Sequence, residues 1–138
     1  MNIPEKPSLF IDGAEFDSLE SFAQHFSARA LSGHHWSGNL DALNDILRGG
    51  FGTPESGFKL IWLNSSVSRK SLGYAETAKQ LHRRLSNCDP TNRDSIAAQL
   101  AQAQAGKGST VFDWLVDIIR EHGEGGSEAE DGIELELR

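Results

Sequence analysis

Phe58-Lys59-Leu60-Ile61-Trp62-Leu63 is the stretch of sequence that decides the fold of this chain. Lys59 is its only polar residue, and the four residues that follow it are all apolar. A short and nearly continuous apolar run is typical of a strand covered on both faces, as in the centre of a parallel sheet. We therefore expect residues 58–63 to form the central strand, and the flanking segments to supply its neighbours and its cover.

A short strand and a helix are predicted near the start of the chain. Leu9-Phe10-Ile11 is an apolar run that ends at the turn dipeptide Asp12-Gly13, which indicates a buried strand. Asp17 is expected to cap the helix that follows, with Glu20 completing a capping box. The apolar side chains of this helix fall on one face: Leu19, Phe22, Ala23 and Phe26.

A second amphipathic helix is predicted over residues 39–48, after a loop at residues 31–37. Either Ser37 or Asn39 can cap it, and Gly49-Gly50 ends it. Its apolar stripe comprises Leu40, Leu43 and Leu47, and its separate polar sector comprises Asp41, Asn44, Asp45 and Arg48.

The chain after the central strand divides into a long helical segment and a closing helix and strand. Residues 64–108 contain two helical stretches separated at Asp89-Pro90, and we expect this segment to be a helical insertion. A further helix begins at Ser109 or Thr110 and ends near Gly123. A Gly/Glu-rich loop at residues 123–132 is expected to be mobile. The closing strand is half-buried, because apolar residues alternate with glutamates: Ile133, Leu135 and Leu137.

Strands at the start, middle and end of the chain, joined by helical crossovers, predict an α/β fold with a small parallel sheet flanked by helices. We expect one domain over residues 1–138. A chain of this length buries roughly two-thirds of its unfolded surface, which is enough for a hydrophobic core without disulfides.

The composition narrows the classes of partner and compartment. The chain has 20 acidic and 13 basic residues, for a net charge of −7, which disfavours direct nucleic-acid binding and favours a basic partner or simply good solubility. Cys88 is the single cysteine, so no internal disulfide can form. No basic leader precedes an apolar stretch, and no run reaches the ~20 apolar residues of a membrane span. We expect a cytoplasmic protein that does not contact membranes.

Several motifs that could indicate chemistry have simpler explanations. Gly106-Lys107-Gly108-Ser109 lacks the spacing of a phosphate-binding loop and follows a helix, so we interpret it as a turn. His34 and His35 could bind a metal with Asp41 and Asp45, but adjacent histidines diverge and no third soft ligand lies nearby. No nucleophile motif is present, and the spacing of Asp41 and Asp45 gives no reason for divergent pKa values. We therefore expect a protein without a metal, a cofactor or catalytic residues.

The segment 64–108 also carries a basic cluster, which could contact RNA or an acidic protein. The solvated face of an amphipathic helix is the more common explanation of such a cluster. Its members are Arg69, Lys70, Lys79, Arg83 and Arg84.

The polar sector of helix 39–48 has one unusual feature. Asp41 and Asp45 are four residues apart, so their carboxylates are neighbours on the helix surface and repel each other slightly. The helix N-terminus partly offsets this repulsion at Asp41. Composition and periodicity alone favour an ordinary solvated face.

The segment from His35 to Leu47, HWSGNLDALNDIL, resembles the signature of the barstar family of ribonuclease inhibitors. The shared features are two aromatic positions, a short Gly-containing turn, and Asn-Leu-Asp-Ala-Leu with a second Asp four residues after the first. The resemblance covers residues 8–63 well and residues 109–138 loosely.

The resemblance implies a three-stranded parallel sheet and no catalysis. It implies that the second helix and the loop before it enter the active site of a guanyl-preferring microbial ribonuclease or a toxin domain. Asp45 takes the place of the residue that mimics the substrate phosphate, and Asp41 matches the first helix Asp. The implied contact set comprises His35, Trp36, Asn39, Asp41, Asn44, Asp45, Arg48, Phe51 and Glu121.

Differences from the family pattern indicate a target other than barnase. His35 stands where the family has a contacting Tyr, and Asn44 stands where it has a contacting Trp. Arg48 can pair with Asp45 three residues earlier and reduce its effective charge. An alternative function is a non-inhibitory interaction module that binds through residues 64–108. In either case we expect the free protein to be a monomer.

Overall fold

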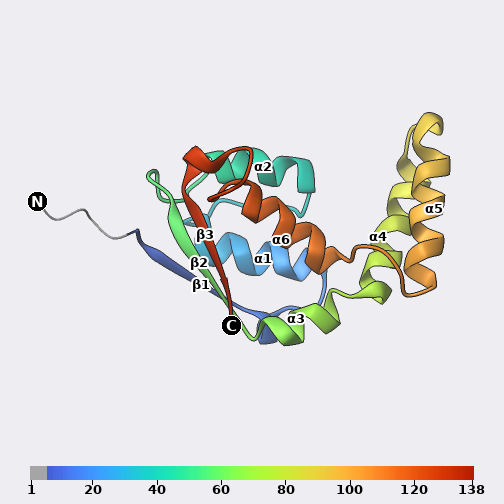
Figure 1. The fold of residues 1–138 in the computed structure, drawn as a ribbon, viewed down its shortest axis with the longest axis horizontal. Helices are drawn as coiled ribbons and strands as arrows, with labels where there is room; N and C mark the ends of the chain where they lie inside the picture. The colour runs from blue at the N-terminus through green and yellow to red at the C-terminus, as the bar shows by residue number, and fades with distance from the viewer. Residues whose placement is uncertain (1–5) are drawn as a thin grey trace, which may run out of the picture.

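The computed structural model describes residues 6–138 and contains a three-stranded parallel sheet (Figure 1). The strands are β1 (Ser8–Asp12), β2 (Phe58–Leu63) and β3 (Ile133–Leu137), in the spatial order β1-β2-β3. β2 is therefore the central strand, as predicted. In the register of the sheet, Ile61 lies between Phe10 and Glu136.

Three helices cover one face of the sheet, and two others form an arm that projects from the body (Figure 1). The covering helices are α1 (Leu19–Ala30), α2 (Leu40–Arg48) and α6 (Val111–Glu121). The arm consists of α4 (Tyr74–Asn87) and α5 (Arg93–Gln104), and α3 (Ser65–Ser71) precedes it. Short 3-10 turns complete the described chain: η1 (Gly13–Glu15), η2 (Pro90–Asn92) and η3 (Ala129–Asp131). These elements confirm the predicted α/β fold class.

Alternate side chains of β2 build the centre of the hydrophobic core. Phe58, Leu60 and Trp62 are at most 1 % exposed, because they point to the face that the helices cover. The Trp62 ring lies 5.1 Å from Phe112 and 5.4 Å from Phe22 between ring centroids. Its indole Nε1 donates to the buried Ser68 hydroxyl at 2.9 Å, so the one polar group of this ring is satisfied.

Two local expectations near the start of the chain were wrong. Ser18, not Asp17, caps α1: its hydroxyl accepts from the Ser21 backbone N–H, and the Ser21 hydroxyl accepts in return from the Ser18 N–H. Phe10 is 47 % exposed, although the apolar run 9–11 indicated a buried strand. β1 is an edge strand, and only Ile11 of that run is fully buried.

The start of α4 is built into the body and serves as a cap for two other helices. Glu76 is 7 % exposed, and its Oε2 accepts from the Leu19 N–H at the start of α1 at 2.7 Å. The hydroxyl of the buried Thr77 accepts from the Val111 N–H at the start of α6 at 2.9 Å. Because helix N-termini have unsatisfied donors, these two bonds fix α4 to both helices. Only the rest of α4 and α5 project.

We expect Glu76→Ala to lower the free energy of unfolding by about 1–3 kcal/mol, because it leaves the buried Leu19 N–H without an acceptor. Urea unfolding measures the change. Glu55→Ala, at an exposed position, is the control and should change stability by less than about 0.5 kcal/mol. Equal effects of the two substitutions would contradict the capping role of Glu76.

The arm has a small core of its own that is joined to the body through one aromatic side chain. Leu81, Leu100 and Ala103 are buried between α4 and α5. Trp114 of α6 packs against both this cluster and the main core.

Within residues 6–138, no helix combines the length and apolar character needed to cross a membrane.

Candidate partner-binding surface

α2 is a rigid helix with an apolar side fixed to the body and an acidic side that faces solvent. Asn39, one of the two predicted candidates, caps it: its Oδ1 accepts from the backbone N–H groups of Asp41 at 2.9 Å and Ala42 at 3.1 Å. The buried side chains of the helix are Leu43, Ile46 and Leu47. Asp41 and Asp45 are both exposed, so the structure places the two predicted carboxylates where a partner can reach them.

Asp45 is held by Arg48 on one side only. The Arg48 Nη1 donates to Asp45 Oδ1 at 2.7 Å, the i, i+3 pair that the sequence anticipated. Within the described part of the chain, Oδ2 of Asp45 has no hydrogen-bond partner. The Asp45 side chain remains 66 % exposed. The carboxylate is thus oriented by one oxygen and open at the other.

Arg48 is itself clamped by Glu128, a residue of the loop that precedes β3. Its Nε donates to Glu128 Oε2 and its Nη2 donates to Oε1, both at 2.6 Å. This two-pronged hydrogen bond raises the pKa of Arg48 and lowers the pKa of Glu128 below its usual range. Both groups are therefore charged at neutral pH, and the clamp prevents Arg48 from folding entirely onto Asp45.

A buried histidine fixes the same loop to α2. His122 is fully buried, with Nδ1 2.7 Å from Asp131 Oδ2 and Nε2 3.0 Å from Asn44 Oδ1. Asn44 was predicted as a partner contact, but the structure shows its half-buried side chain engaged with His122. The segment 123–132, expected to be mobile, thus contains η3, is bonded directly to α2 through Glu128 and Arg48, and is linked to Asn44 of α2 through His122.

His122, Glu128 and Asp131 each offer one possible metal-ligand atom, and these three atoms lie within 4.8 Å of one another, close enough to hold a metal ion. These atoms already bond to each other and to Arg48, so the group is an ion-pair and hydrogen-bond network. Within residues 6–138, His34 and His35 do not form such a group with Asp41 and Asp45.

Trp36, predicted to contact the partner, is instead part of the core. It is 3 % exposed, and its indole Nε1 donates to the Asn39 carbonyl at 2.9 Å. Its ring lies 6.0 Å from both Phe22 and Phe26 of α1. An aromatic ring next to an exposed loop can either face a partner or anchor the loop, and here it anchors the loop that leads into α2.

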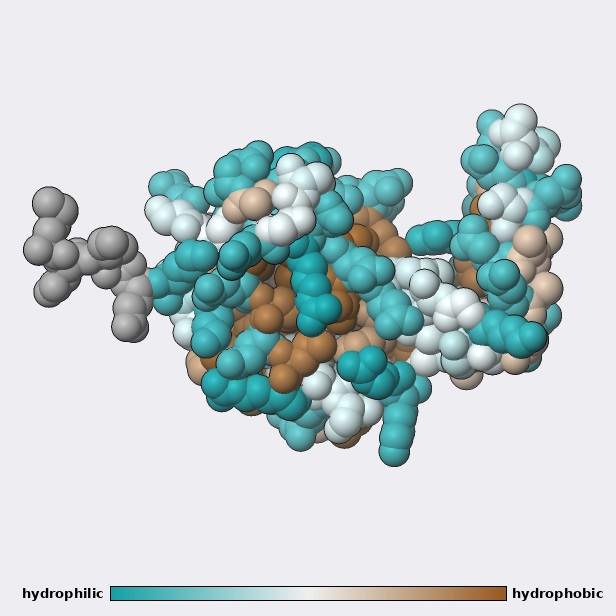
Figure 2. Space-filling model, viewed as in Figure 1, coloured by the Kyte–Doolittle hydropathy of each residue, from teal (hydrophilic) through white to brown (hydrophobic). Residues whose placement is uncertain are grey.

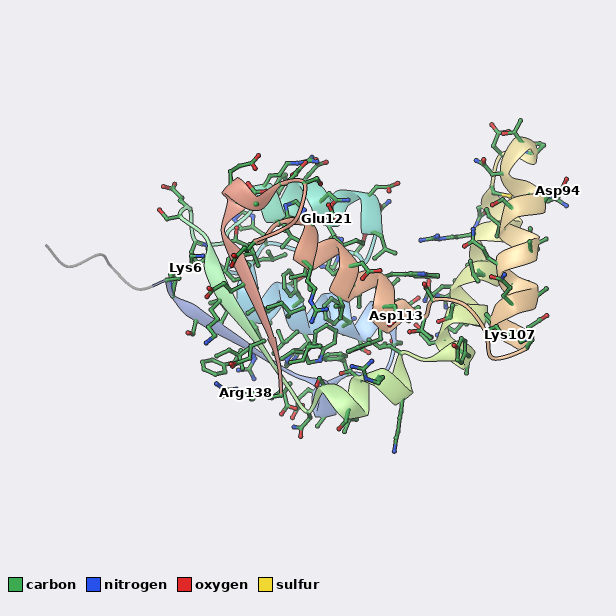
Figure 3. The ribbon with its side chains drawn as sticks, viewed as in Figure 1. Lys6, Asp94, Lys107, Asp113, Glu121 and Arg138 are labelled. Carbon is green, nitrogen blue, oxygen red and sulfur yellow. The ribbon has the colours of Figure 1, made fainter. Side chains whose placement is uncertain are left out.

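The remaining residues predicted to contact the partner lie in two places, on the loops next to α2 and at the end of α6. His35 and Phe51 are exposed on the loops before and after α2, and Phe51 is 45 % exposed. Glu121 lies at the end of α6 (Figure 3), where it accepts from the Ser127 backbone N–H and hydroxyl. These hydrogen bonds lower the pKa of Glu121.

Sequence reasoning did not identify His122, Glu128 or Asp131. His122 is a lone histidine after an amphipathic helix, and the two acids lie in a segment whose composition indicated mobility. The partners of His122 and Glu128 on α2 are 78 and 80 residues away in the chain, and a local sequence pattern does not reveal contacts over that distance.

Comparison with known families gives one match. Residues 7–98, two-thirds of the chain, match the family described as Barstar (barnase inhibitor). The match extends beyond β2 through α3 and α4 into α5, so it does not set residues 64–108 apart as a whole from the family pattern. No curated protein and no solved structure matches the chain. The extent of the family match, together with the three-stranded parallel sheet, shows that this protein belongs to the barstar family.

Proposed function

We propose that this protein binds a microbial ribonuclease and blocks its active site with the acidic side of α2. The observation that carries the proposal is Asp45: an exposed carboxylate on a fixed helix, with one oxygen oriented by Arg48 and the other open. The family to which the chain belongs is described as an inhibitor of the ribonuclease barnase, which supports the same function.

The chemistry of the target explains why such a carboxylate can block it. A ribonuclease active site is a cleft with cationic side chains that bind phosphate. A carboxylate on a rigid helix can replace the phosphate, because little conformational freedom is lost when it binds. Opposite charges on the two surfaces also accelerate association. Asp45 is therefore proposed as the phosphate mimic and Asp41 as a supporting contact.

The surrounding contacts follow from the positions of the exposed residues. His35, Asn39 and Phe51 flank α2, and Glu121 lies at the loop that holds Arg48. We propose that the inhibitor acts in the cytoplasm as a monomer, on a ribonuclease made by the same cell or on an incoming toxin domain. Nucleic acid is not a direct ligand in this proposal.

The experiment is a titration of the protein against a panel of purified guanyl-preferring microbial ribonucleases that includes barnase. RNA cleavage is followed at 0.15 M and at higher ionic strength. We expect stoichiometric inhibition of at least one enzyme and weaker inhibition at high salt, because screening reduces the attraction between exposed charges. A panel in which no enzyme is inhibited would contradict the proposed function.

Glu128→Gln is expected to weaken inhibition by up to about fivefold, the range of a surface ion pair. Without the Glu128 carboxylate, Arg48 is free to neutralise Asp45. Arg48→Met in the same chain should remove the effect. Because Arg48 lowers the pKa of Glu128, the clamp persists above the ordinary pKa of a carboxyl group and is lost as the pH falls through the lowered value.

Glu130→Gln is the control for this prediction, because Glu130 is exposed in the same loop. If Glu128→Gln and Glu130→Gln have the same inhibition constant, the clamp does not act on Asp45.

The projecting arm favours a second candidate function, a non-inhibitory interaction module that binds through α4 and α5. In that case the protein binds a partner without blocking RNA cleavage, and substitution of Asp45 leaves the affinity unchanged. The panel titration therefore distinguishes the two functions.

A further inference from the structure

We infer that the bound ribonuclease also contacts the arm, through an acidic side chain that pairs with Arg84 across a groove from Asp41. This inference rests on the proposed function and names the charge pattern that the target must carry. The groove continues the acidic surface of α2, because Asn39 and Asp41 form one of its walls.

The groove is a polar hollow of about 280 Å³ between the start of α2 and the arm. Gln80 and Arg84 of α4 form the wall opposite Asp41, and Leu19 and Gly38 also line it. The space-filling view shows the surface hollowed between the body and the arm (Figure 2). A volume of this size accommodates a few side chains of a partner rather than a whole element.

Arg84 is the cation of α4 that has no acidic partner within the described residues. Arg83 forms an ion pair with Glu20, and Lys79 lies 3.5 Å from Glu76. Arg84 instead lies over the ring of Trp114, with its Cζ 5.0 Å from the ring centroid. This contact orients the guanidinium and leaves its charge without a counter-ion. Asp41 on the opposite wall also has no ion-pair partner among residues 6–138.

The wall that carries Arg84 is held firmly beside α2. Glu76 and Thr77, in the same helix, cap α1 and α6, and Trp114 belongs to α6. The positive and negative walls of the groove therefore keep their separation without a partner, so a partner that matches both is bound with little loss of freedom.

The charge of the arm restricts the kind of ribonuclease that fits. Residues 64–108 carry seven Lys and Arg against three Asp and Glu, a net charge of +4, so the rest of the chain carries −11. An enzyme with a uniformly cationic surface would be attracted by α2 and repelled by the arm. An enzyme whose cationic cleft has an acidic rim is attracted by both, and the acidic rim residue then lies against Arg84.

The test uses the full chain, with the panel enzyme that it inhibits most strongly as the probe. Arg84→Glu is compared with Arg93→Glu, which makes the same change in net charge at an exposed position at the start of α5. Asp94, the next residue, marks this position at the outer end of the arm (Figure 3). We expect Arg84→Glu to weaken binding at least about tenfold more than Arg93→Glu, because it places like charges together.

Arg84→Lys keeps the charge and should bind within about threefold of the unchanged protein, the range of a surface ion pair. If Arg84→Glu lowers the melting temperature markedly, Arg84→Gln replaces it and should still weaken binding.

Whether Arg84→Glu weakens or strengthens binding to the ribonuclease decides the inference. Tighter binding by Arg84→Glu would show that a cationic surface faces the arm, and equal binding by Arg84→Glu and Arg93→Glu would show that the groove is empty. Either result overturns the inference while inhibition through Asp45 stands. Absence of inhibition across the panel removes the proposed function and this inference with it.

Discussion

Asp45→Ala is expected to weaken binding to the inhibited ribonuclease by about 100-fold or more. In the complex that we propose, the Asp45 carboxylate pairs with cationic groups of the enzyme away from water. Removal of one member of a buried pair costs about 3–5 kcal/mol, because the other charge remains buried without a partner. Each 1.4 kcal/mol corresponds to about a tenfold change in the dissociation constant. The inhibition constant from RNA cleavage measures the loss.

Asp94→Ala is the matched control for Asp45→Ala. Asp94 is also an exposed helical aspartate, but it lies on the arm (Figure 3). Both substitutions change the net charge equally, so a difference between their inhibition constants reflects only the position of the aspartate that is removed. If the two variants have the same inhibition constant, Asp45 is not the phosphate mimic.

Trp36→Ala is expected to lower the free energy of unfolding by about 3–5 kcal/mol, the range for removal of a buried aromatic side chain. Trp36 is 3 % exposed and packs against two rings of α1. The substitution leaves a cavity and releases the loop that leads into α2. Chemical denaturation measures the loss of stability.

Trp36→Phe separates the packing role of Trp36 from its hydrogen bond. Phe retains most of the ring contacts and loses the donation from Nε1 to the Asn39 carbonyl. We expect a smaller loss, about 1–2 kcal/mol, for one hydrogen bond and a reduced ring volume. A stable Trp36→Ala variant with weakened inhibition would instead identify Trp36 as a partner contact.

The fold was predictable because its main signals are local. The apolar run of β2 and the alternation in β3 each indicate a strand. Of the apolar stripe predicted on α2, Leu43 and Leu47 are buried and Leu40 is partly buried. The Asp45–Arg48 pair was also predicted, and Asn39 was one of two predicted caps, since both contacts join residues at most three apart. Contacts at this range follow from helix geometry alone.

The features that the sequence did not predict depend on contacts between segments that are distant in the chain. Nothing near Glu76 in the chain shows that its carboxylate caps α1, 57 residues away. The same holds for the clamp from Glu128 to Arg48, 80 residues apart. Trp36 was expected to contact the partner because it lies in the segment that resembles the family signature, whereas its packing against α1 buries it.

The most direct measurement of how the protein acts is its inhibition of RNA cleavage at several substrate concentrations. Initial rates with a guanylyl dinucleotide substrate give the apparent inhibition constant for the unchanged protein and for Asp45→Asn. If α2 occupies the active site through Asp45, the apparent constant rises linearly with substrate concentration, and Asp45→Asn inhibits far less at every concentration. An inhibition constant that is independent of substrate, or equal for the two proteins, would contradict phosphate mimicry by Asp45.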